Sequence, residues 1–502
     1  MTPERLPADD DLVRYRDPEA SREALLTLGA AVWTDALDWL YGRAAEVPTE
    51  GLTYEASRER FFGAGGEAAA APEHGRSWRA VLADVRERVG RDAFSHAHPR
   101  TFAYFTPPPL PMAIAGDVWA PWLNQGVDIW QGAPSATFVE EEVVAWLRSL
   151  VGYPEDGFGV LTSGGAMANL MALSVARDHV DASEGRPRAS GLGPMRLYGS
   201  DQTHFSITRA LDILGFDGST FRAVPTDDRF HIDVDALVRA IEQDLAAGAR
   251  PFAIVAVAGA TNTGAVDPIP AVADVAERFG LWVHVDAAYG GAVRLSERDA
   301  ARVPGLERAD SVTLDPHKWF FQPYDIGGLL VRRRDDLADT FHRAPEYLRS
   351  SHDEPLDWYH FTLEGTRRFR GLKLWMSWQH LGTRGFGELV ERTNDLAAYL
   401  ADRCRDDPML ELAVDPPELS VVCFRIVPAA GLGERAVDEH QDRVQRELER
   451  SRAGWLSTTT LRGRTYLRAG VMNHMGTEAD IDGVLDAVRT SSRAVTGGAS
   501  TA

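Results

Sequence analysis

The chain has 502 residues and a mass of 55.1 kDa, and its 53 basic and 74 acidic side chains give a formal net charge of −21. This acidic balance argues against a nucleic-acid-binding surface, which needs clustered Lys and Arg. No apolar run approaches the roughly 20 residues of a membrane-spanning helix, and the polar, acidic N-terminus does not resemble a secretory signal. With only two cysteines, Cys404 and Cys423, a disulfide framework is excluded, so we expect a soluble protein of the reducing cytoplasm.

The first hundred residues are predicted to be mainly helical. Within 24–41 (ALLTLGAAVWTDALDWLY), apolar side chains recur at nearly helical spacing, which predicts an amphipathic helix. The stretch 63–75 is rich in Gly and Ala and is typical of a linker. Further along the chain, Ser135 is a suitable N-cap for a helix that ends at Gly152.

Between about 155 and 335 the sequence alternates between strand and helix patterns. Apolar segments at 252–257, 281–289, 310–315 and 327–333 are predicted as strands, and the helix before the second of them ends at Gly280. Strands that are apolar on both faces and separated by helices indicate a parallel sheet in an α/β fold. Ligands of such sheets bind at the C-terminal ends of the strands.

The remaining segments are less regular. Residues 337–362 show no steady period, and we expect a long polar loop of the kind that covers many active sites. Beyond about 390, helix and strand patterns indicate a small α+β domain. We therefore divide the chain into an N-terminal helical segment (1–105), a large domain (106–390), a small C-terminal domain (391–490) and a disordered tail (491–502).

Lysine is almost absent from the sequence. Of the 53 basic residues, only Lys318 and Lys373 are lysines, and the others are arginines. A GC-rich genome explains this bias, but a lysine retained under it is a candidate for chemistry that arginine cannot perform, since lysine can lose its proton and attack a carbonyl group. Lys373 falls in a helical run, where a surface or interface cation is the simpler interpretation. Lys318 follows a predicted strand, in the sequence DPHKW.

A carboxylate ends another of the predicted strands. Asp286 and Lys318 are therefore both expected at the C-terminal edge of the sheet. Either they are an ordinary polar strand end and a surface lysine, or they form the pair that pyridoxal phosphate (PLP) requires. In PLP enzymes a lysine forms a Schiff base with the cofactor, and a carboxylate keeps the pyridine nitrogen protonated.

A phosphate site is expected beside this pair. The turn at 164–166 (GGA) follows a short strand and opens a helix, whose free N–H groups and dipole favour a phosphate; a plain turn is the alternative. His204 is either a core or surface histidine, or an aromatic plate over the cofactor ring. No metal site is expected, since no third ligand accompanies His96 and His98.

Eight motifs, taken in chain order, resemble one family of enzymes. They are AYFTPP, PSATFVEEEVVAWL, TSGGAMANLMAL, DQTHFSI, GATNTGAVDP, WVHVDAAYGG, DPHKW and RRFRGLKLWMSW. From about residue 20 to 490 the chain is similar to the group II PLP-dependent amino-acid decarboxylases, such as aromatic-L-amino-acid decarboxylase. The resemblance implies PLP fold type I, with a mostly parallel seven-stranded sheet in the large domain. It also implies a homodimer in which the N-terminal segments clasp the partner and the active site lies at the interface.

The resemblance assigns roles to individual residues. It implies that Lys318 forms the Schiff base, that Asp286 pairs with the pyridine nitrogen, and that Ala288 packs under the ring. His204 would stack on the other face of the ring, and Tyr347, on the predicted loop, would protonate the α-carbon of the substrate. Further cofactor contacts would come from Gly164, Gly165, Ala166, Thr261 and His317.

The phosphate site departs from the family pattern at two positions. Ala166 stands where many relatives have Ser or Thr, so that Ser163, Thr313 or a partner subunit would have to replace one hydrogen bond. Asp315 stands where some aromatic decarboxylases have Asn. Because an ionised carboxylate cannot donate a hydrogen bond to phosphate, we expect no direct contact there.

The substrate pocket departs from the pattern at Asp128, which stands where the mammalian aromatic enzyme has Phe. Its carboxylate either favours a cationic or hydroxylated substrate or turns away and caps a turn. Tyr104, Phe105 and Trp130 would build an aromatic pocket, which favours a bulky substrate.

The sequence therefore predicts a PLP-dependent carboxy-lyase that converts an L-amino acid, with an aromatic or other bulky side chain favoured, to the amine and CO2. Two alternatives use the same cofactor: oxidative deamination to an aldehyde, and decarboxylation of a cationic or diamino acid. The presence of Tyr347 favours simple decarboxylation. A non-catalytic homologue is the least favoured, because Lys318, Asp286 and His204 are intact. We expect no nucleic-acid or membrane partner.

Overall fold

The computed structural model describes residues 18–63, 65, 67–68, 70–183, 185, 193–343, 356–427 and 433–497. The chain divides into two compact units, which are taken in turn. The larger unit comprises residues 104–425 and 468–474, and the smaller one comprises residues 1–103, 426–467 and 475–502. The domain boundaries expected from the sequence stay a prediction.

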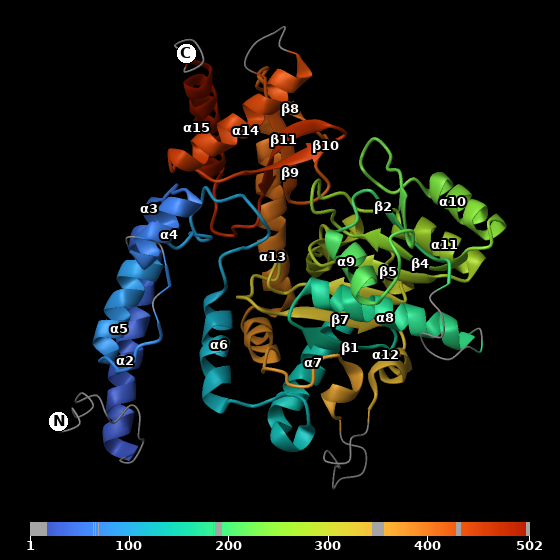
Figure 1. Cartoon of the computed structure of the whole chain (residues 1–502), viewed down its shortest axis with the longest axis horizontal. Helices are drawn as coiled ribbons and strands as arrows, with labels where there is room; N and C mark the ends of the chain where they lie inside the picture. Colours follow the sequence, from blue (N-terminus) through green and yellow to red (C-terminus); the bar gives the residue numbers. More distant parts are fainter. Residues whose placement is uncertain are drawn as a thin grey trace. The chain divides into compact units, whose positions relative to one another are not determined.

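The larger unit contains helices and strands in alternation (Figure 1). Its helices are α6 (Pro111–Leu123), α7 (Pro134–Val151), α8 (Gly165–Ser183), α9 (Phe205–Ile213), α10 (Val234–Ala246), α11 (Ile269–Phe279), α12 (Arg334–Phe341) and α13 (Gly371–Arg405). Its strands are β1 (Phe158–Thr162), β2 (Met195–Ser200), β3 (Phe221–Val224), β4 (Arg250–Val257), β5 (Trp282–Asp286), β6 (Ser311–Leu314), β7 (Gly327–Val331), β8 (Leu410–Leu412) and most of β9 (Val421–Ile426).

Seven of these strands form one sheet, in the order β1-β7-β6-β5-β4-β2-β3. The pairs among β2, β3, β4, β5 and β6 are parallel, whereas β7 runs antiparallel to both of its neighbours. The fold class expected from the family resemblance is thereby confirmed. Val257 is paired with Asp286, and Asp286 with Thr313, so the C-terminal ends of β4, β5 and β6 lie at one edge.

The burial of these strands agrees with their apolar sequence pattern. All five residues of β5 and the last six of β4 are buried, as their continuous apolar pattern predicts for strands covered on both faces. Helix α8 packs across β4 to β7, and α7 packs against β1 and β7. Helix α11 ends at Gly280, whose φ of +67° is the left-handed C-cap conformation that the sequence indicates.

Three local predictions were wrong. Helix α7 begins at Pro134, because proline is suited to the first helical position. Ala133 is therefore the N-cap, and Ser135 lies inside the helix. The predicted loop at 337–362 begins within α12, which buries Leu337 and Thr340. The tail expected from 491 is helical as far as Gly497, because α15 continues and buries Ser491 and Ser492.

The smaller unit is mainly helical. Its elements are α2 (Pro18–Asp38), α3 (Ala44–Glu46), α4 (Tyr54–Phe62), α5 (Trp78–Asp84), α14 (Glu434–Arg450), β10 (Ser457–Leu461), the first part of β11 (Arg464–Gly470) and α15 (Glu478–Gly497), with π-helical turns at 39–43 and 85–90. Strands β10, β11, β9 and β8, in that order, form a second sheet. Helix α2 confirms the predicted helix at 24–41, but it leaves Leu26, Val32 and Trp33 exposed.

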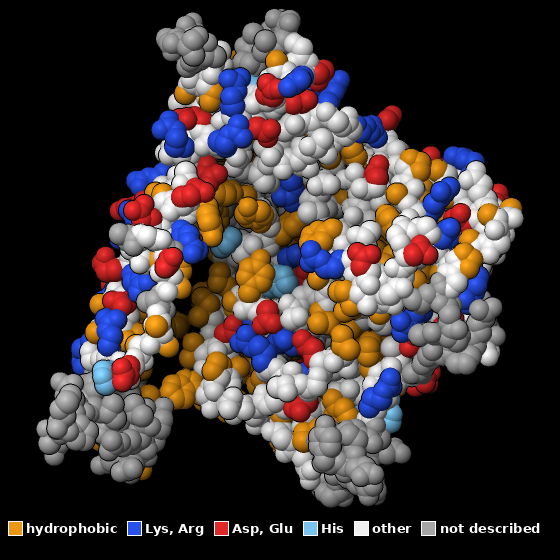
Figure 2. Space-filling model, viewed as in Figure 1, with side chains coloured by type: hydrophobic (Ala, Val, Ile, Leu, Met, Phe, Trp, Pro, Cys, Tyr) orange, Lys and Arg blue, Asp and Glu red, His pale blue; other side chains and the backbone are white. Residues whose placement is uncertain are grey.

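Charged side chains of both signs are interspersed on the face drawn in Figure 2, without separating into regions of one sign. None of the helices in the described part of the chain combines the length and the apolar character that crossing a bilayer requires.

Candidate active site

Loops from the C-terminal ends of β1, β2, β4, β5 and β6 meet around a cavity of about 410 Å³ in the larger unit. Its lining residues are Ser163, Gly164, Gly165, Ala166, Met167, Asn169, Gln202, His204, Val257, Gly259, Thr261, Asp286, Ala288, Tyr289, Asp315, His317, Lys318 and Tyr324. The cavity lies where the strand pattern predicts a ligand site.

The turn between β1 and α8 depends on two glycines. Gly164 has a φ of +149°, and its N–H donates to Thr162 Oγ1 at 3.3 Å. A Cβ at Gly165 would lie only 2.8 Å from Asp315 Oδ2, so a side chain there would collide with the carboxylate. The first N–H groups of α8 have no acceptor within the helix and adjoin the cavity, which suits an anion.

Lys318 brings an amine to the cavity just beyond β6. Its Nζ lies 2.9 Å from Asp315 Oδ2 and 5.9 Å from the centre of the Phe105 ring. Burial alone would lower the pKa of Lys318, but the carboxylates of Asp315 and Asp286 outweigh this effect and raise the pKa above its ordinary value. The side chain of Lys318 is therefore protonated next to these two carboxylates.

His317 is fixed beside this lysine. Its Nδ1 donates to the Ile326 carbonyl oxygen at 2.6 Å, and its ring lies 4.7 Å from that of Tyr324. Burial lowers the pKa of His317, so the imidazole is neutral near pH 7.

Asp286 and His204 face the cavity from β5 and from the start of α9. Asp286 is 6% exposed; its Oδ2 accepts a hydrogen bond from Asn169 Nδ2 at 2.9 Å, and its Oδ1 accepts one from the N–H of Ala288 at 3.2 Å. His204 Nδ1 lies 2.7 Å from Ser206 Oγ, and burial lowers the pKa of His204.

Aromatic side chains form one side of the site. The Phe105 ring stacks on Tyr289 at 4.2 Å between centroids, and the guanidinium of Arg468 lies 4.6 Å from the centre of the same Phe105 ring. Arg468 Nε donates to the Thr261 carbonyl oxygen at 2.7 Å. This arginine is 5% exposed, so a nearly buried cation stands next to the residues that line the cavity.

The structure brings together all nine residues expected to contact the cofactor, since each of them lines the cavity. Of the expected substrate residues, Phe105 does not line it but is buried against Tyr289, which does, whereas Tyr104 is 55% exposed. Asp128 and Trp130 do not line it; Asp128 borders a different cavity, of about 620 Å³, together with Arg343 and Tyr359. Tyr347 lies outside the described residues. The catalytic and binding roles of all these residues stay predictions.

Two expectations about polar residues need correction. Thr313 does not replace the missing phosphate contact at Ala166, because its Oγ1 is buried and donates to Asn169 Oδ1 at 2.7 Å. Ser163, the other candidate on this chain, does line the cavity. Lys373 is not a surface cation: its side chain is 0% exposed, and its Nζ donates to the Pro323 carbonyl oxygen at 2.9 Å and pairs with Asp117 at 3.1 Å.

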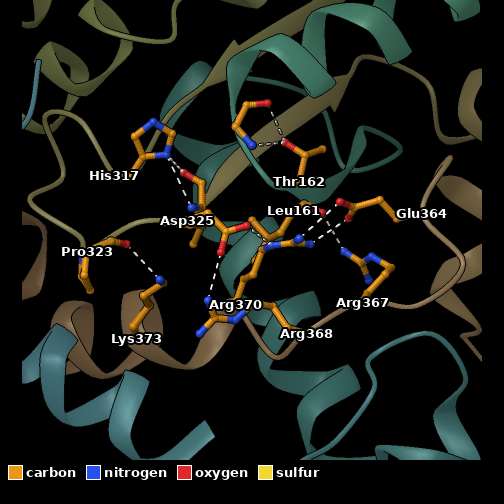
Figure 3. Close-up of polar contacts among 12 residues, drawn as sticks. Leu161, Thr162, His317, Pro323, Asp325, Glu364, Arg367, Arg368, Arg370 and Lys373 are labelled. Atoms are coloured by element: carbon orange, nitrogen blue, oxygen red, sulfur yellow. Dashed lines mark hydrogen bonds and ion pairs between the residues drawn. The ribbon is translucent and has the colours of Figure 1, made fainter. Parts of the chain in front are cut away.

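Lys373 belongs to a polar cluster that fixes the chain next to Tyr324 (Figure 3). Asp325 pairs with Arg368 at 3.0 Å and with Arg370 at 3.2 Å. Contacts of Lys373 with Pro323 and of two arginines with Asp325 therefore hold both neighbours of Tyr324, whose side chain lines the cavity.

Sequence reasoning missed Asn169, Tyr289, Tyr324 and Arg468. Asn169 carried a usable signal, since it is a polar residue within the otherwise apolar segment ANLMAL of a predicted helix. Arg468 carried none, because the chain has many arginines and only the fold brings this one to Phe105.

Comparisons with known proteins agree with this geometry. Residues 65–427 match the family described as the pyridoxal-dependent decarboxylase conserved domain. The chain is 33% identical to an aromatic-L-amino-acid decarboxylase of Bacillus atrophaeus, over 80% of this chain and 83% of the relative. It is 35% identical to an L-2,4-diaminobutyrate decarboxylase of Rhizobium meliloti (strain 1021), over 84% and 83%.

A solved structure extends the match to nearly the whole chain. The crystal structure of Oryza sativa TDC with PLP and tryptamine has a TM-score of 0.87 and 29% identity, and it covers 98% of this chain and 99% of that one. The cavity, the lysine and carboxylate that face it, and these matches lead to one conclusion: the chain belongs to the pyridoxal-dependent decarboxylases and is a PLP-dependent amino-acid carboxy-lyase.

Proposed function

We propose that Lys318 holds PLP as a Schiff base while Asp286 pairs with the pyridine nitrogen. The observation that supports this most is that the amine of Lys318 and the carboxylate of Asp286 face the same cavity from the ends of β6 and β5. His204 would cover one face of the ring and Ala288 the other, and Thr261 would lie near the ring. Bound there, PLP supplies an electron-accepting ring that stabilises the charge left when CO2 departs.

The phosphate of the cofactor would lie at the start of α8. The backbone N–H groups of Gly165 and Ala166 open the helix there, Gly164 adjoins them, and Ser163 lines the same cavity. Asp315 Oδ1 is buried and has no hydrogen-bond partner among the described residues, but an ionised carboxylate cannot donate to phosphate, so we assign it no phosphate contact. His317 would help to fix the cofactor beside Lys318.

The substrate that we propose is an L-amino acid with an aromatic or other bulky side chain, converted to the amine. The stacked rings of Phe105 and Tyr289 support this choice, as do the names of the Bacillus relative and of the TDC complex with tryptamine. Tyr104 would extend the pocket, and so would Trp130 from a neighbouring subunit. Asp128, reaching the substrate in the same way, would favour the alternative, a cationic or diamino acid, and the diaminobutyrate decarboxylase relative agrees with it.

Arg468 would balance the charge of the substrate carboxylate. An amino acid brings this negative charge into an apolar site, where an unpaired charge is costly. Arg468 is a nearly buried guanidinium beside Phe105 and Thr261, and burial lowers its pKa. Binding of the substrate carboxylate would offset the cost of burying this cation.

Tyr347 would return a proton to the α-carbon of the substrate after CO2 has left. This role separates simple decarboxylation from the oxidative alternative, in which oxygen intervenes and an aldehyde, ammonia and peroxide form. A tyrosine at this position supports the amine product.

We also propose a cytoplasmic homodimer. Exposed apolar side chains on α2 (Leu26, Val32 and Trp33) and on α6 (Trp119 and Trp122) support a second subunit, since isolated surfaces rarely carry so many. Light scattering over a range of concentrations tests this, and a monomer throughout would refute it.

Product analysis by mass spectrometry tests the proposed reaction. The PLP-loaded protein would be offered each proteinogenic L-amino acid, ornithine, diaminobutyrate and dihydroxyphenylalanine separately, with Lys318→Ala as the inactive control. Amine from an aromatic substrate would support the proposal, and amine from a cationic one would give Asp128 the specificity role. Aldehyde with peroxide would refute the proton-donor role of Tyr347.

A further inference from the structure

The side-chain amide of Asn169 lies at the centre of a buried polar network. Asn169 is 1% exposed and belongs to the second turn of α8. Its Nδ2 lies 2.9 Å from Asp286 Oδ2 and 2.9 Å from Ser206 Oγ, and its Oδ1 lies 2.7 Å from Thr313 Oγ1 and 3.0 Å from His284 Nε2. All four hydrogen bonds that a primary amide can make are therefore used.

The chemistry of the partners fixes the direction of each bond. The carboxylate of Asp286 can only accept, so the NH₂ group of Asn169 must face it, and the amide cannot be turned over. Asn169 Oδ1 then accepts from His284, so the proton of that ring lies on Nε2. Burial lowers the pKa of His284 to about 4, which keeps the ring neutral.

Ser311 holds the far side of His284. The indole Nε1 of Trp282 can only donate, and it lies 2.9 Å from Ser311 Oγ. The Ser311 hydroxyl therefore gives its own proton to His284 Nδ1, at 2.8 Å. This bond and the one to Asn169 leave the imidazole a single tautomer.

The second N–H of Asn169 fixes the tautomer of His204 through the hydroxyl of Ser206. Ser206 Oγ accepts from Asn169, so its hydroxyl proton points to His204 Nδ1 at 2.7 Å, and the backbone N–H of Ser206 donates to the same nitrogen at 3.3 Å. His204 Nδ1 is thus an acceptor, and the proton of the neutral ring lies on Nε2.

We propose that Asn169 is a positioning residue that orients Asp286 and His204 together, so that one buried amide sets both groups expected to contact the cofactor ring. This inference rests on the proposed roles of those two residues. Because the network is buried and every member is satisfied, a change at Asn169 is transmitted to both side chains.

The variant Asn169→Asp tests this with the smallest change of shape. It replaces the donating NH₂ by an oxygen 2.9 Å from Asp286 Oδ2. Two carboxylates at that distance share one proton, and they repel each other once the proton is lost as the pH rises. The other titratable groups that act on Asp286 are Lys318, His204 and His284. All three are present in both proteins, so the comparison with wild type isolates the change made at residue 169.

The measured quantity is the Kd for PLP, from titration of the PLP-free chain followed by the absorbance of the bound cofactor. We expect the ratio of the Kd of Asn169→Asp to that of wild type to rise at least tenfold between pH 6.0 and pH 8.5. A purely structural role would weaken binding equally at both pH values. A ratio that stays flat with pH would overturn the proposal.

A matched control is available in α13. Asn394 is 4% exposed and donates to Asp299 Oδ2 at 2.9 Å, so Asn394→Asp creates the same pair of carboxylates outside the cavity. Its Kd ratio should remain within about twofold of 1 at both pH values. Asp286→Asn separates a failure of the proposed role of Asp286 from a failure of the inference about Asn169. Wild-type affinity for PLP in that variant would refute the role of Asp286 itself. If the affinity is lost, a flat Kd ratio for Asn169→Asp would refute only the positioning role of Asn169.

Ser311→Ala keeps the proposal testable if Asn169→Asp does not fold. It removes one hydroxyl that lies outside the cavity and leaves His284 Nδ1 without its donor. We expect the Kd for PLP to rise at least threefold. Wild-type affinity would overturn the proposal, since the network would then not reach Asp286.

Discussion

Two adjacent glycines of β7 offer a sharp test of how the sheet shapes the phosphate turn. A Cβ at Gly327 would lie 2.5 Å from Gly164 Cα, 2.7 Å from Gly164 C and 2.8 Å from Asp315 Oδ1. Carbon atoms in contact normally lie about 3.5–4.0 Å apart, so Gly327→Ala overlaps backbone atoms by roughly 1 Å. A Cβ at Gly328 has its nearest neighbours at 3.8 Å, which is ordinary contact.

The expected magnitudes follow from this contrast. Overpacking costs about 1–3 kcal/mol, and Gly327→Ala belongs at the upper end because backbone, not a flexible side chain, must move. Gly328→Ala should be neutral or stabilise by up to about 1 kcal/mol through the loss of freedom in the unfolded chain. Since Gly164 lines the cavity, we also expect Gly327→Ala to raise the Kd for PLP at least tenfold.

Denaturant unfolding and PLP titration of both variants provide the assay. Gly328→Ala controls for the general effect of an added methyl group in the same strand. If Gly327→Ala unfolded and bound PLP as Gly328→Ala does, the close approach of β7 to the turn at Gly164 would be refuted.

Three further predictions concern other parts of the larger unit. Lys373→Met should lower the free energy of unfolding by about 3 kcal/mol, because among the described residues it leaves Asp117 with one remaining cation, Arg368. In a double-mutant cycle with Asp117→Asn the two losses should not add. The hydrogen bond to Glu418, at 2.6 Å, raises the pKa of His231. The contribution of protonated His231 to stability is therefore present below about pH 6.5, and it is lost as the pH rises through the pKa of His231 in the folded protein. His231→Gln should therefore be less stable than wild type at pH 6, with a smaller difference at pH 9 in thermal unfolding; an equal difference at both would contradict this. Tyr347→Phe should lose amine formation and yield aldehyde by mass spectrometry, whereas unchanged amine output would show that Tyr347 is not the acid.

Much of the fold was predictable because local patterns and tertiary burial agree. The continuous apolar runs of β4 and β5 are buried as expected, and Gly280 ends α11. The antiparallel direction of β7 was not predictable, since an apolar run such as GGLLV fits a parallel and an antiparallel strand equally well. The helical course of 491–497 was missed because its Ser, Arg and Thr residues are typical of a tail, and only packing buries Ser491 and Ser492.

The candidate site was predictable where chemistry requires a rare residue type. Lys318 stood out because the chain has almost no lysine, and the position of Asp286 at a strand end placed it on the same edge. Lys373 shows the limit of that signal: it is equally rare, yet its amine is buried against Asp117 and Pro323. Asn169 and Arg468 were missed because their importance arises from neighbours far away in the sequence.

The most direct test of the proposed site is to find which lysine binds PLP. Borohydride adds hydride to the C=N bond between PLP and a lysine, which turns the Schiff base into a stable secondary amine that survives digestion. Peptide mass spectrometry of the reduced holoenzyme should place the pyridoxyl group on Lys318 and leave Lys373 unmodified. A label on Lys373, or none on either lysine, would contradict the assignment of Lys318 as the residue that holds the cofactor.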